Sequence, residues 1–279
     1  MAGKDLRDLL RNQKLVLPGA YNAFSAKQIA QEGFPGIYIS GAGLSNGLGV
    51  PDDGTLGMED FLYMGRWIVQ AVDVPVLCDA DTGFENIEHT VRKYIEVGLS
   101  GLHIEDQVFP KKCGHLPGKE IIPMYEMADK IKRACRVRDS VDSDFVIIAR
   151  TDARGADNID DEQQFEESVT RGNLYREAGA EVIFPESLRT QEEFARYRKE
   201  VDGYLLANMT EFGKTPFISA KEFMDLGYNI IIFPVSLFRY HAGQTKMFLS
   251  RLRQEGTQQH LVNGMMDRAE INGLLDYKG

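Results

Sequence analysis

A cysteine set among cations is the residue in this sequence with the clearest potential for chemistry. Cys113 stands in the run Lys111–His115, which reads Lys-Lys-Cys-Gly-His and is bounded by prolines and glycines that forbid a long regular element. Neighbouring cations stabilise a thiolate and lower the pKa of a thiol. We therefore expect a mobile loop that carries Cys113 as an acid or base, with Lys111 and His115 as further catalytic residues. The alternative is a solvated basic loop with an incidental cysteine.

Four carboxylates fall where they can share a cation. Asp79 and Asp81 are two residues apart, so both point the same way from an extended chain. Glu105 ends the next apolar run, and Asp52 lies in the loop after an earlier one. Oxygen ligands of this kind suit Mg²⁺, with Mn²⁺ as an alternative, and without a metal such carboxylates would repel each other and some would protonate. Zinc is not expected, because no His or Cys falls at ligand spacing near the Asp pair.

Other polar groups suit a substrate that carries several carboxylates. Arg150 offers a planar fork that matches a carboxylate, and Arg239 offers a second one. Each arginine could equally form a salt bridge at the end of a strand. Asn208 and Thr210 supply neutral hydrogen bonds, and Glu186 can pair with one of the arginines.

Glycines after Ser40 imitate a nucleotide-binding loop. Gly41, Gly43, Gly47 and Gly49 follow an apolar run, but the next segment, Val50-Pro-Asp-Asp-Gly, cannot open the helix that a dinucleotide motif requires, and no phosphate-binding Lys follows. The glycines are better suited to letting backbone amides approach an anionic oxygen beside Ser40.

Alternating β-like and helix-like segments must position these residues. Eight short apolar runs are visible: 14–17, 36–40, 76–79, 101–105, 145–150, 182–185, 204–208 and 229–234. Amphipathic segments lie between them, at 23–32, 58–72, 87–97, 125–137, 162–178 and 192–201. This alternation predicts parallel strands with right-handed crossovers, in a closed (β/α)8 barrel or an open doubly wound sheet, and eight runs favour the barrel.

The polar residues gather at one end of this predicted barrel. Nearly every apolar run terminates in a group that is costly to bury unpaired: Ser40, Asp79, Glu105, Arg150, Glu186, Asn208 and Ser236. The carboxyl ends of barrel strands converge on one mouth, where barrel enzymes place their chemistry. We expect one domain over residues 1–279, with a C-terminal helical extension at about 237–279 formed by the helical stretches 237–253 and 258–275.

The composition and net charge of the chain exclude some classes of binding partner. With 279 residues, 43% hydrophobic, the chain can bury a sizeable core. Its net charge of −10 argues against nucleic acid or anionic lipid as partner. No apolar run reaches the length of a membrane span, and the N-terminus has no signal-peptide core. Three cysteines without paired spacing fit a reducing compartment, so we expect a cytoplasmic protein.

The motifs together resemble the isocitrate lyase and phosphoenolpyruvate mutase superfamily, and within it the methylisocitrate lyases. The resemblance runs nearly end to end. It covers Tyr38-Ile-Ser-Gly, Asp79-Ala-Asp, Leu102-His-Ile-Glu-Asp-Gln, Lys111-Lys-Cys-Gly-His, Ile148-Ala-Arg-Thr-Asp, Phe184-Pro-Glu, Asn208-Met-Thr-Glu-Phe-Gly, Phe233-Pro-Val-Ser-Leu-Phe-Arg and Leu252-Arg-Gln-Glu-Gly-Thr-Gln. The Cys-Gly-His loop separates carbon–carbon lyases from phosphonomutases.

The resemblance implies a Mg²⁺-dependent cleavage of 2-methylisocitrate to pyruvate and succinate. It implies that Asp79 and Asp81 hold the metal, with Glu105 and Asp52 reaching it through water, and that Cys113 protonates the succinate carbanion. Tyr38 is the candidate base for the substrate hydroxyl. Substrate contacts are implied for Ser40, Gly41, Ala42, Gly114, Arg150, Glu186, Asn208, Thr210, Arg239 and Arg268. The family commonly has Gly where this chain has Ala42.

The resemblance also implies an assembly, a homotetramer built as a dimer of dimers with its final helices swapped between subunits. The chain after Arg268 is shorter than this assembly leads us to expect. Phe184, Ile232 and Pro234 are expected to form the apolar wall that accepts the extra methyl group of methylisocitrate. Isocitrate, dimethylmalate and oxaloacetate-type substrates remain alternatives, since one methyl group is worth only about 1–3 kcal/mol. A non-catalytic carboxylate-binding barrel is a further alternative.

Overall fold

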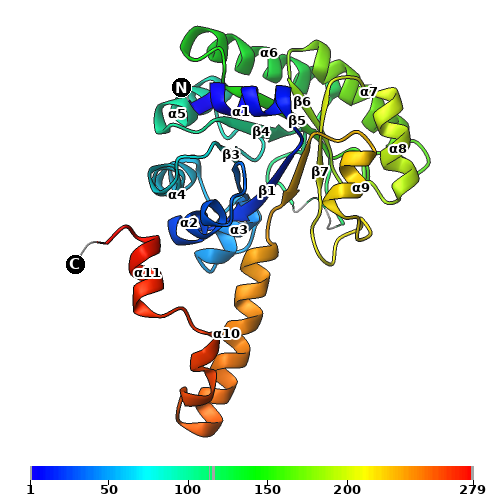
Figure 1. The fold of residues 1–279 in the computed structure, drawn as a ribbon. Helices are drawn as coiled ribbons and strands as arrows, with labels where there is room; N and C mark the ends of the chain where they lie inside the picture. The colour runs from blue at the N-terminus through cyan, green and yellow to red at the C-terminus, as the bar shows by residue number, and fades with distance from the viewer. Residues whose placement is uncertain (1, 113, 115–116, 278–279) are drawn as a thin grey trace.

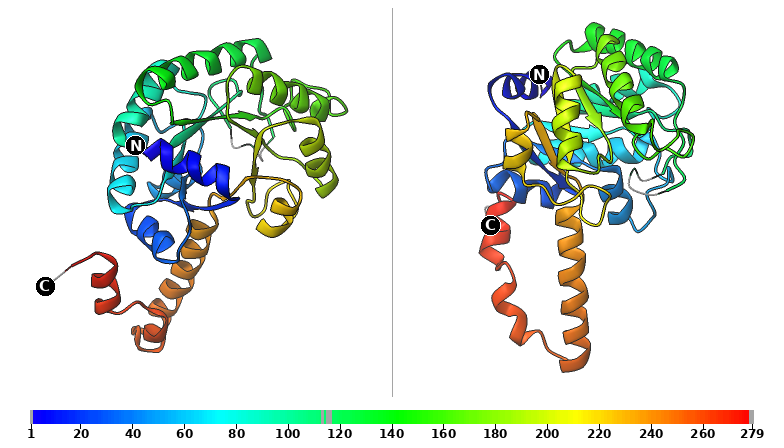
Figure 2. Two further views of the ribbon diagram at one scale, coloured as in Figure 1. Left: turned by 45° about the horizontal axis from the view of Figure 1, so that its top comes forward. Right: turned by 90° about the vertical axis from the view of Figure 1, so that its right-hand side faces the viewer.

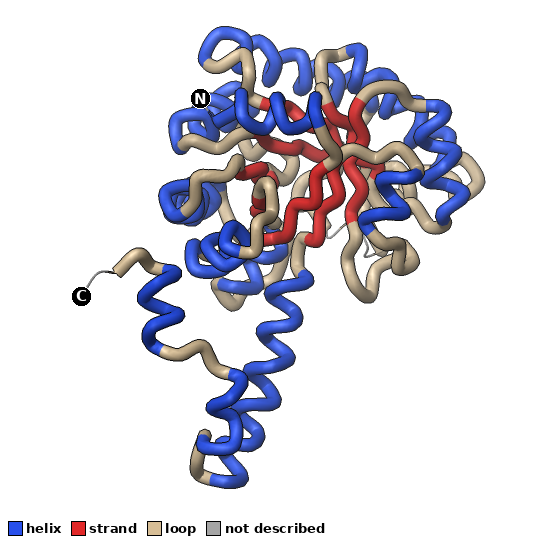
Figure 3. Tube along the Cα trace, in the orientation of Figure 1, coloured by secondary structure: helices blue, strands red, loops and turns tan. Residues whose placement is uncertain are grey.

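A closed barrel of eight parallel strands forms the centre of the computed structural model, which describes residues 2–112, 114 and 117–277 (Figures 1 and 3). Each strand pairs with the next along the chain, and β8 closes the ring by pairing in parallel with β1. The strands are β1 (Leu15–Ala20), β2 (Ile37–Ile39), β3 (Val76–Asp79), β4 (Gly101–Glu105), β5 (Val146–Thr151), β6 (Val182–Pro185), β7 (Tyr204–Asn208) and β8 (Ile230–Phe233). The closed barrel is confirmed, and the open doubly wound sheet is excluded.

Helices follow the strands and surround the barrel (Figure 1). They are α1 (Ala2–Asn12), α2 (Ala23–Gln31), α3 (Gly41–Gly47), α4 (Met58–Ala71), α5 (Ile87–Val97), α6 (Met124–Val141), α7 (Gln164–Glu177), α8 (Gln191–Glu200), α9 (Ala220–Asp225), α10 (Ser236–Glu255), the 3-10 helix η1 (Gln259–Gly264) and α11 (Arg268–Leu274). Local sequence sets their ends. The Asn86 side chain caps α5 by accepting from the His89 amide at 3.0 Å, and Gly98, at φ +94°, ends it in the left-handed conformation.

Two apolar layers hold the barrel together, because successive strand side chains point alternately inward and outward. The inner layer includes Leu77, Ile148 and Leu206, and Leu6 and Leu10 of α1 pack against it. The outer layer lies between the strands and the surrounding helices. Since α1 contributes to the inner layer, it covers one end of the barrel, and the polar strand ends lie at the other.

Helix α1 was not among the predicted helical segments, and three other features of the helices differ from the sequence prediction. The glycine-rich segment after Ser40 forms α3, because the Ser40 Oγ accepts from the Gly43 amide at 3.3 Å and caps a helix that was not anticipated. The short helix α9 was also not anticipated. The predicted helical stretch 258–275 is divided into η1 and α11, because Asp267 starts a new helix by accepting from the Glu270 amide at 2.8 Å.

The C-terminal segment extends away from the barrel. Figures 1 and 2 show α10 projecting beyond the helices that surround the barrel, and the chain returning through η1 and α11. No residue within α10 is buried, and α11 contacts the barrel at α2. Apolar side chains on this segment are therefore left in contact with solvent in the single chain, among them Tyr240, Met247 and Leu249.

Candidate active site

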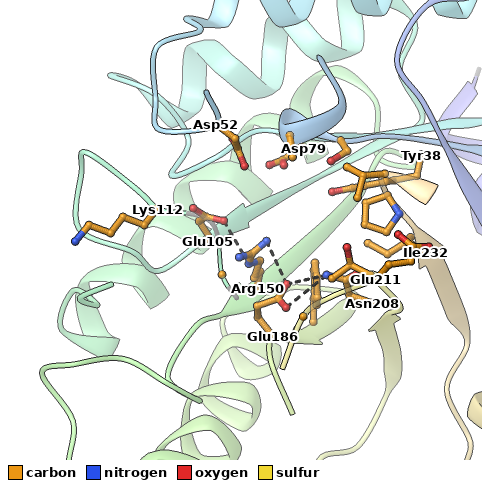
Figure 4. A pocket seen from close by; sticks show the side chains of 18 of the residues that line it. Tyr38, Asp52, Asp79, Glu105, Lys112, Arg150, Glu186, Asn208, Glu211 and Ile232 are labelled. Carbon is orange, nitrogen blue, oxygen red and sulfur yellow. Dashed lines mark hydrogen bonds and ion pairs between the residues drawn. The ribbon is translucent and has the colours of Figure 1, made fainter. Parts of the chain in front are cut away.

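A cavity of about 270 Å³ opens at the carboxyl ends of the strands (Figure 4). Most of the residues expected to do chemistry line it: Tyr38, Ser40, Ala42, Asp52, Asp79, Glu105, Lys111, Gly114, Arg150, Glu186, Asn208, Thr210 and Arg239. They come from the strand ends and from the loops that follow, which is where the sequence placed them. The strands thus bring together residues that lie as far apart as 38 and 239 in the chain.

Strand register places an arginine among carboxylates at the centre of the cavity. Glu105 of β4 lies directly opposite Arg150 of β5, and Arg150 lies opposite Phe184 of β6. The Arg150 Nε is 3.3 Å from Glu105 Oε2, its Nη1 is 3.3 Å from Glu186 Oε2, and its guanidinium lies over the Phe184 ring at 5.2 Å. The pairing of Glu186 with an arginine is therefore confirmed, and Arg150 forms salt bridges while also facing the cavity.

Asp79 and Asp81 face the same point, but not through the extended chain that the sequence prediction assumed, because β3 ends at Asp79. A Cβ atom on Gly41 would lie 3.0 Å from Asp79 Oδ2 and 3.3 Å from Asp81 Oδ1, so the two carboxylates converge beside this glycine. The Gly41 amide donates to Asp79 Oδ2 at 3.1 Å, and the Asp81 amide donates to Asp79 Oδ1 at 2.9 Å. Asp81 itself adopts φ +46°, an uncommon value for a residue with a side chain, which turns its carboxylate back toward Asp79.

Lys111 pairs with one of these carboxylates, Asp81, and with Asp52. Its Nζ forms ion pairs with Asp52 and with Asp81 Oδ1, the latter at 2.7 Å, and its side chain is almost completely buried. Burial opposes the charge of Lys111, but the surrounding carboxylates outweigh it and raise its pKa well above the ordinary value. Lys111 is thus a fixed positive charge beside the four carboxylates of Asp52, Asp79, Asp81 and Glu105, which we call the acidic rim.

The acidic rim carries more negative charge than its cations neutralise. Burial and the neighbouring Asp79 raise the pKa of Asp81 to about 7, although Lys111 opposes the shift. Burial also raises the pKa of Glu105 well above its usual range. Burial alone would raise the pKa of Asp79 too, but His103, Lys111 and Arg150 outweigh it and lower that pKa. Because like charges repel each other in a buried site, some of these carboxylates are protonated unless a further cation binds beside them.

The donor set fits a hard divalent cation. The Glu105 Oε1 atom is buried and has no hydrogen-bond partner, and Asp79 and Asp81 offer converging oxygens. Among the residues that the structure describes, no three His, Cys, Asp or Glu side chains form a ready metal-binding group. Mg²⁺ is usually held by one or two carboxylates with several waters, so two converging carboxylates are sufficient.

Tyr38 and His103 form a buried pair beneath the acidic rim. The Tyr38 hydroxyl lies 2.7 Å from His103 Nε2, and the same nitrogen lies 3.5 Å from Asp79 Oδ1. His103 Nδ1 is buried without a hydrogen-bond partner, and burial lowers the pKa of His103, which favours the neutral ring. Burial and Asp79 raise the pKa of Tyr38 well above its ordinary value. This shift argues against the role of base expected for Tyr38, because a buried phenolate beside a carboxylate is costly.

Gly114 brings the cysteine-containing loop to the cavity. A Cβ atom at this position would lie 2.6 Å from Glu186 Cγ and 3.0 Å from Asp152 Oδ1, and closer still to Arg150 Nη2. The Gly114 carbonyl also accepts from Ser187 Oγ at 2.9 Å. Cys113 and His115, both predicted to be catalytic, lie outside the described residues.

The β7 and β8 ends supply the neutral and cationic groups on the far side of the cavity. Asn208 Nδ2 donates to Glu186 Oε2 at 3.2 Å, and Arg239 Nη1 donates to Thr210 Oγ1 at 3.1 Å. Arg239 also pairs with Glu211 Oε2 at 3.1 Å, a partner that the sequence did not suggest. The predicted apolar wall is present, since Phe184, Ile232 and Pro234 all line the cavity.

Some residues differ from their expected place. Arg268 begins α11 on the projecting segment and does not line this cavity, so the single chain does not bring it to the site. The Gly41 amide donates to Asp79 Oδ2, and Gly41 does not line the cavity. Asp152 was not recognised, although it lies two residues after Arg150 and the period of a strand predicts a shared direction. Lys119, which pairs with Asp152, gave no pattern that could have revealed it.

Comparisons with known proteins relate nearly the whole chain to a family of enzymes. A family model described as "Phosphoenolpyruvate phosphomutase" matches residues 6–252. The chain is 42% identical over 279 residues to the 2-methylisocitrate lyase of Aeropyrum pernix, covering 99% of this chain and 87% of the relative. It is also 42% identical over 276 residues to the 2,3-dimethylmalate lyase of Eubacterium barkeri, covering 97% and 92%.

Solved structures of related enzymes superpose closely. An oxaloacetate acetylhydrolase in complex with the inhibitor 3,3-difluorooxalacetate gives a TM-score of 0.90 at 32% identity, covering 99% of this chain and 94% of that one. A phosphonopyruvate hydrolase in complex with oxalate and Mg²⁺ gives 0.87 at 29% identity, covering 99% and 95%. The fold is thus shared by enzymes that differ in the bond they break.

Proposed function

The chain belongs to the phosphoenolpyruvate phosphomutase family, and within it we propose that it is a carbon–carbon lyase that cleaves 2-methylisocitrate to pyruvate and succinate. The observation that carries the proposal is the position of Gly114. This residue of the Cys-Gly-His loop packs against Arg150 and Glu186 in the cavity, beside the acidic rim. A thiol-bearing loop, an arginine and a cation-binding rim are the parts that such a cleavage needs.

We assign the metal to Asp79 and Asp81, with Glu105 and Asp52 positioned to hold it through water. Mg²⁺, or Mn²⁺ in its place, would supply positive charge to the oxygens of the substrate when bound. The converging Asp79 and Asp81 oxygens, and the unpaired Glu105 Oε1, support this assignment.

Substrate carboxylates would be bound at two places in the cavity. Arg150 lies beside the acidic rim, and Arg239 lies with Thr210 and Asn208 on the other side. Ser40, Ala42 and Gly114 complete the wall around the 2-oxo acid portion of the substrate.

The chemistry requires one proton to leave the substrate hydroxyl and one to arrive at carbon. Transfer of the hydroxyl proton to an ionised carboxylate of the acidic rim lets the carbon–carbon bond break, which forms the carbonyl of pyruvate and leaves a carbanion on the succinate portion. We propose that the Cys113 thiol gives its proton to that carbon. Its described neighbours, Lys112 and Gly114, both line the cavity, which supports this role. Lys111 and His115 would then adjust the charge around the thiol.

We assign Tyr38 the role of hydrogen-bond donor. In a neutral His103, an unpaired Nδ1 is least costly when it carries no hydrogen, so Nε2 carries it, and the nearby Asp79 carboxylate favours the same tautomer. The Tyr38 oxygen then accepts from His103, and its own proton is free to face the cavity. A donor at this position would stabilise a negative oxygen of the substrate.

We also propose a cytoplasmic homotetramer, built as a dimer of dimers in which the C-terminal segment is exchanged. The exposed apolar side chains of α10 support an assembly, and Arg268 would join a substrate site only if the segment reached another subunit. No helix in the described part of the chain is long and apolar enough to cross a membrane. Cys78 and Cys135 are unpaired, which fits a reducing compartment. Light scattering that gave four times the chain mass of 31.4 kDa would support the tetramer, and a monomer would exclude it.

A substrate panel tests the proposed function. The purified protein with Mg²⁺ is offered 2-methylisocitrate, isocitrate, 2,3-dimethylmalate and oxaloacetate, and the products are identified by mass spectrometry. We expect equimolar pyruvate and succinate from 2-methylisocitrate, with the highest kcat/KM. Preferred cleavage of dimethylmalate would make the protein a dimethylmalate lyase, and release of acetate from oxaloacetate would make it a hydrolase. No turnover of any of the four would favour a non-catalytic carboxylate-binding protein.

A further inference from the structure

Behind the cavity lies an ion pair that the proposed reaction does not use. Lys119 Nζ is 3.0 Å from Asp152 Oδ1, and both side chains are fully buried. Neither residue lines the cavity. Buried ion pairs are costly to form and are weak evidence for stability, so a pair in this place calls for another explanation.

Asp152 also holds Arg150. The Arg150 Nε donates to Asp152 Oδ2 at 2.7 Å, and Arg150 Nη2 donates to Asp152 Oδ1 at 3.0 Å. This bidentate contact occupies one edge of the guanidinium and leaves the Nη1 group on the other edge. The orientation of Arg150 in the cavity is therefore set by a carboxylate that lies behind it.

A hydrogen bond from its backbone holds Asp152 in place. Its amide donates to Asp106 Oδ1 at 2.8 Å, while Asp106 Oδ2 accepts from Arg171 Nη1 at 3.0 Å and from the Tyr175 hydroxyl at 2.8 Å. These groups are buried, so the contacts are shielded from solvent. Asp152 is thus held in place by its backbone and can hold Arg150 in turn.

Lys119 is held with similar precision from the loop after β5. The Asp157 amide donates to the Lys119 carbonyl at 2.8 Å. Two residues later, Ile121 exchanges hydrogen bonds with the Asn158 side chain at 3.1 and 2.9 Å. Lys119 therefore presents its ammonium group to Asp152 from a fixed backbone.

The positive charge of Lys119 offsets part of the negative charge around Arg150. Three carboxylates, those of Glu105, Asp152 and Glu186, lie within 3.3 Å of the Arg150 guanidinium. Three carboxylates against one guanidinium leave an excess of negative charge that would repel an incoming carboxylate. Lys119 shares Asp152 with Arg150 and so offsets one of these negative charges.

We propose that Lys119 and Asp152 are positioning residues that keep Arg150 oriented for a substrate carboxylate, with Lys119 reducing the net negative charge around it. The inference rests on the proposed function only in taking Arg150 as a carboxylate-binding residue. It does not depend on which substrate is cleaved, or on whether the reaction is a cleavage at all.

Direct binding of oxalate, measured by calorimetry with MgCl₂ present, tests the proposal apart from turnover. Removal of one charged contact costs about 1.5–3 kcal/mol, so Lys119→Met should raise the Kd for oxalate by about tenfold to 150-fold. Arg138→Met is the matched control. Arg138 also forms an ion pair, with Glu181 at 2.5 Å, and neither of these residues lines the cavity. It should lower Tm and leave the Kd unchanged.

The double variant Lys119→Met/Asp152→Asn separates positioning from stability. It removes both buried charges, so it should fold even if Lys119→Met does not, and its Tm should recover toward that of the wild type. Its Kd should stay raised, because an asparagine in place of Asp152 would no longer hold Arg150 by a charged bidentate contact. A wild-type Kd in the double variant would overturn the proposal. Unchanged oxalate binding in Arg150→Met would overturn it at its premise.

Discussion

Substitution of Gly114 by alanine should damage the active site while leaving the barrel intact. The added Cβ would lie 2.6 Å from Glu186 Cγ and 3.0 Å from Asp152 Oδ1, and still closer to Arg150 Nη2. A Cβ atom does not approach other heavy atoms below about 3 Å, so one of the groups must move. An arginine can usually swing aside, but Arg150 is fixed by its contacts with Asp152 and Glu186.

The magnitude follows from what must move. Overpacking a tightly filled site costs about 1–3 kcal/mol. At about 1.4 kcal/mol for each factor of ten, this corresponds to a decrease in kcat/KM of about fivefold to 150-fold. The strain falls on a loop and on one edge of the cavity rather than on the apolar layers of the barrel, so Tm should change by only a few degrees.

The assay is pyruvate release from 2-methylisocitrate, coupled to lactate dehydrogenase, together with thermal unfolding. Gly65→Ala is the matched control, because Gly65 is buried in α4 and an added Cβ there meets only Leu99 and Val97 at 3.8–3.9 Å, which is ordinary contact. If Gly114→Ala retained kcat/KM within twofold of wild type and of Gly65→Ala, the packing of this loop against Arg150 and Glu186 would be wrong.

Three further predictions follow from burial and charge. In a ¹⁵N-histidine spectrum, assigned with His103→Gln, the His103 ring should carry its hydrogen on Nε2; a hydrogen on Nδ1 would contradict the donor role of Tyr38. Burial favours a protonated Asp152, but Arg150 and Lys119 outweigh burial and hold the pKa of Asp152 at about 2, below the usual 3.8. The ionised Asp152 therefore contributes about 2 kcal/mol to the free energy of unfolding above about pH 4, and this contribution fades as the pH falls toward 2. The difference in urea unfolding free energy between wild type and Asp152→Asn should therefore narrow from pH 6 to pH 3, and a constant difference would refute it. Burial raises the pKa of Cys78 well above its ordinary value and that of Cys135 to about 11, so iodoacetamide at pH 7.5 should label Cys113 first, in step with loss of activity; peptide mapping that found Cys78 or Cys135 labelled first would refute it.

The barrel was accessible from the sequence because its strands are short, apolar and regularly spaced. All eight strands were located, and four of them, such as Gly101–Glu105, have the predicted bounds. Helices whose residues have low helix propensity were harder to recognise. The glycine-rich α3 forms because Ser40 caps it and the barrel positions it, and neither effect is visible in a periodicity.

The site was predicted where strand ends determine it, and less well where tertiary contacts do. Asp79, Glu105 and Arg150 follow directly from the period of a strand and the common mouth of a barrel, whereas the direction of Asp81 depends on a φ of +46° after β3 ends. Lys119 was missed because its role arises from a fold-dependent contact with Asp152, 33 residues away in the chain.

The assignment of Tyr38 as a hydrogen-bond donor rather than a base could not have been made from the sequence. Its pKa depends on complete burial and on the nearby Asp79, and its hydrogen bond to His103 depends on the register of three neighbouring strands. Arg268 is a related case, since the path of the chain after α10 decides which cavity, if any, it can reach, and its role in substrate binding stays a prediction.

The central claim is that a cysteine thiol on the loop beside Gly114 protonates a carbanion formed in the acidic, arginine-containing cavity. Its most direct test is the comparison of wild type with Cys113→Ser, measuring both the release of pyruvate and succinate from 2-methylisocitrate and the Kd for oxalate. We expect turnover to fall by about a hundredfold or more, while the Kd stays within a few-fold of wild type. Turnover close to wild type in Cys113→Ser would contradict the account.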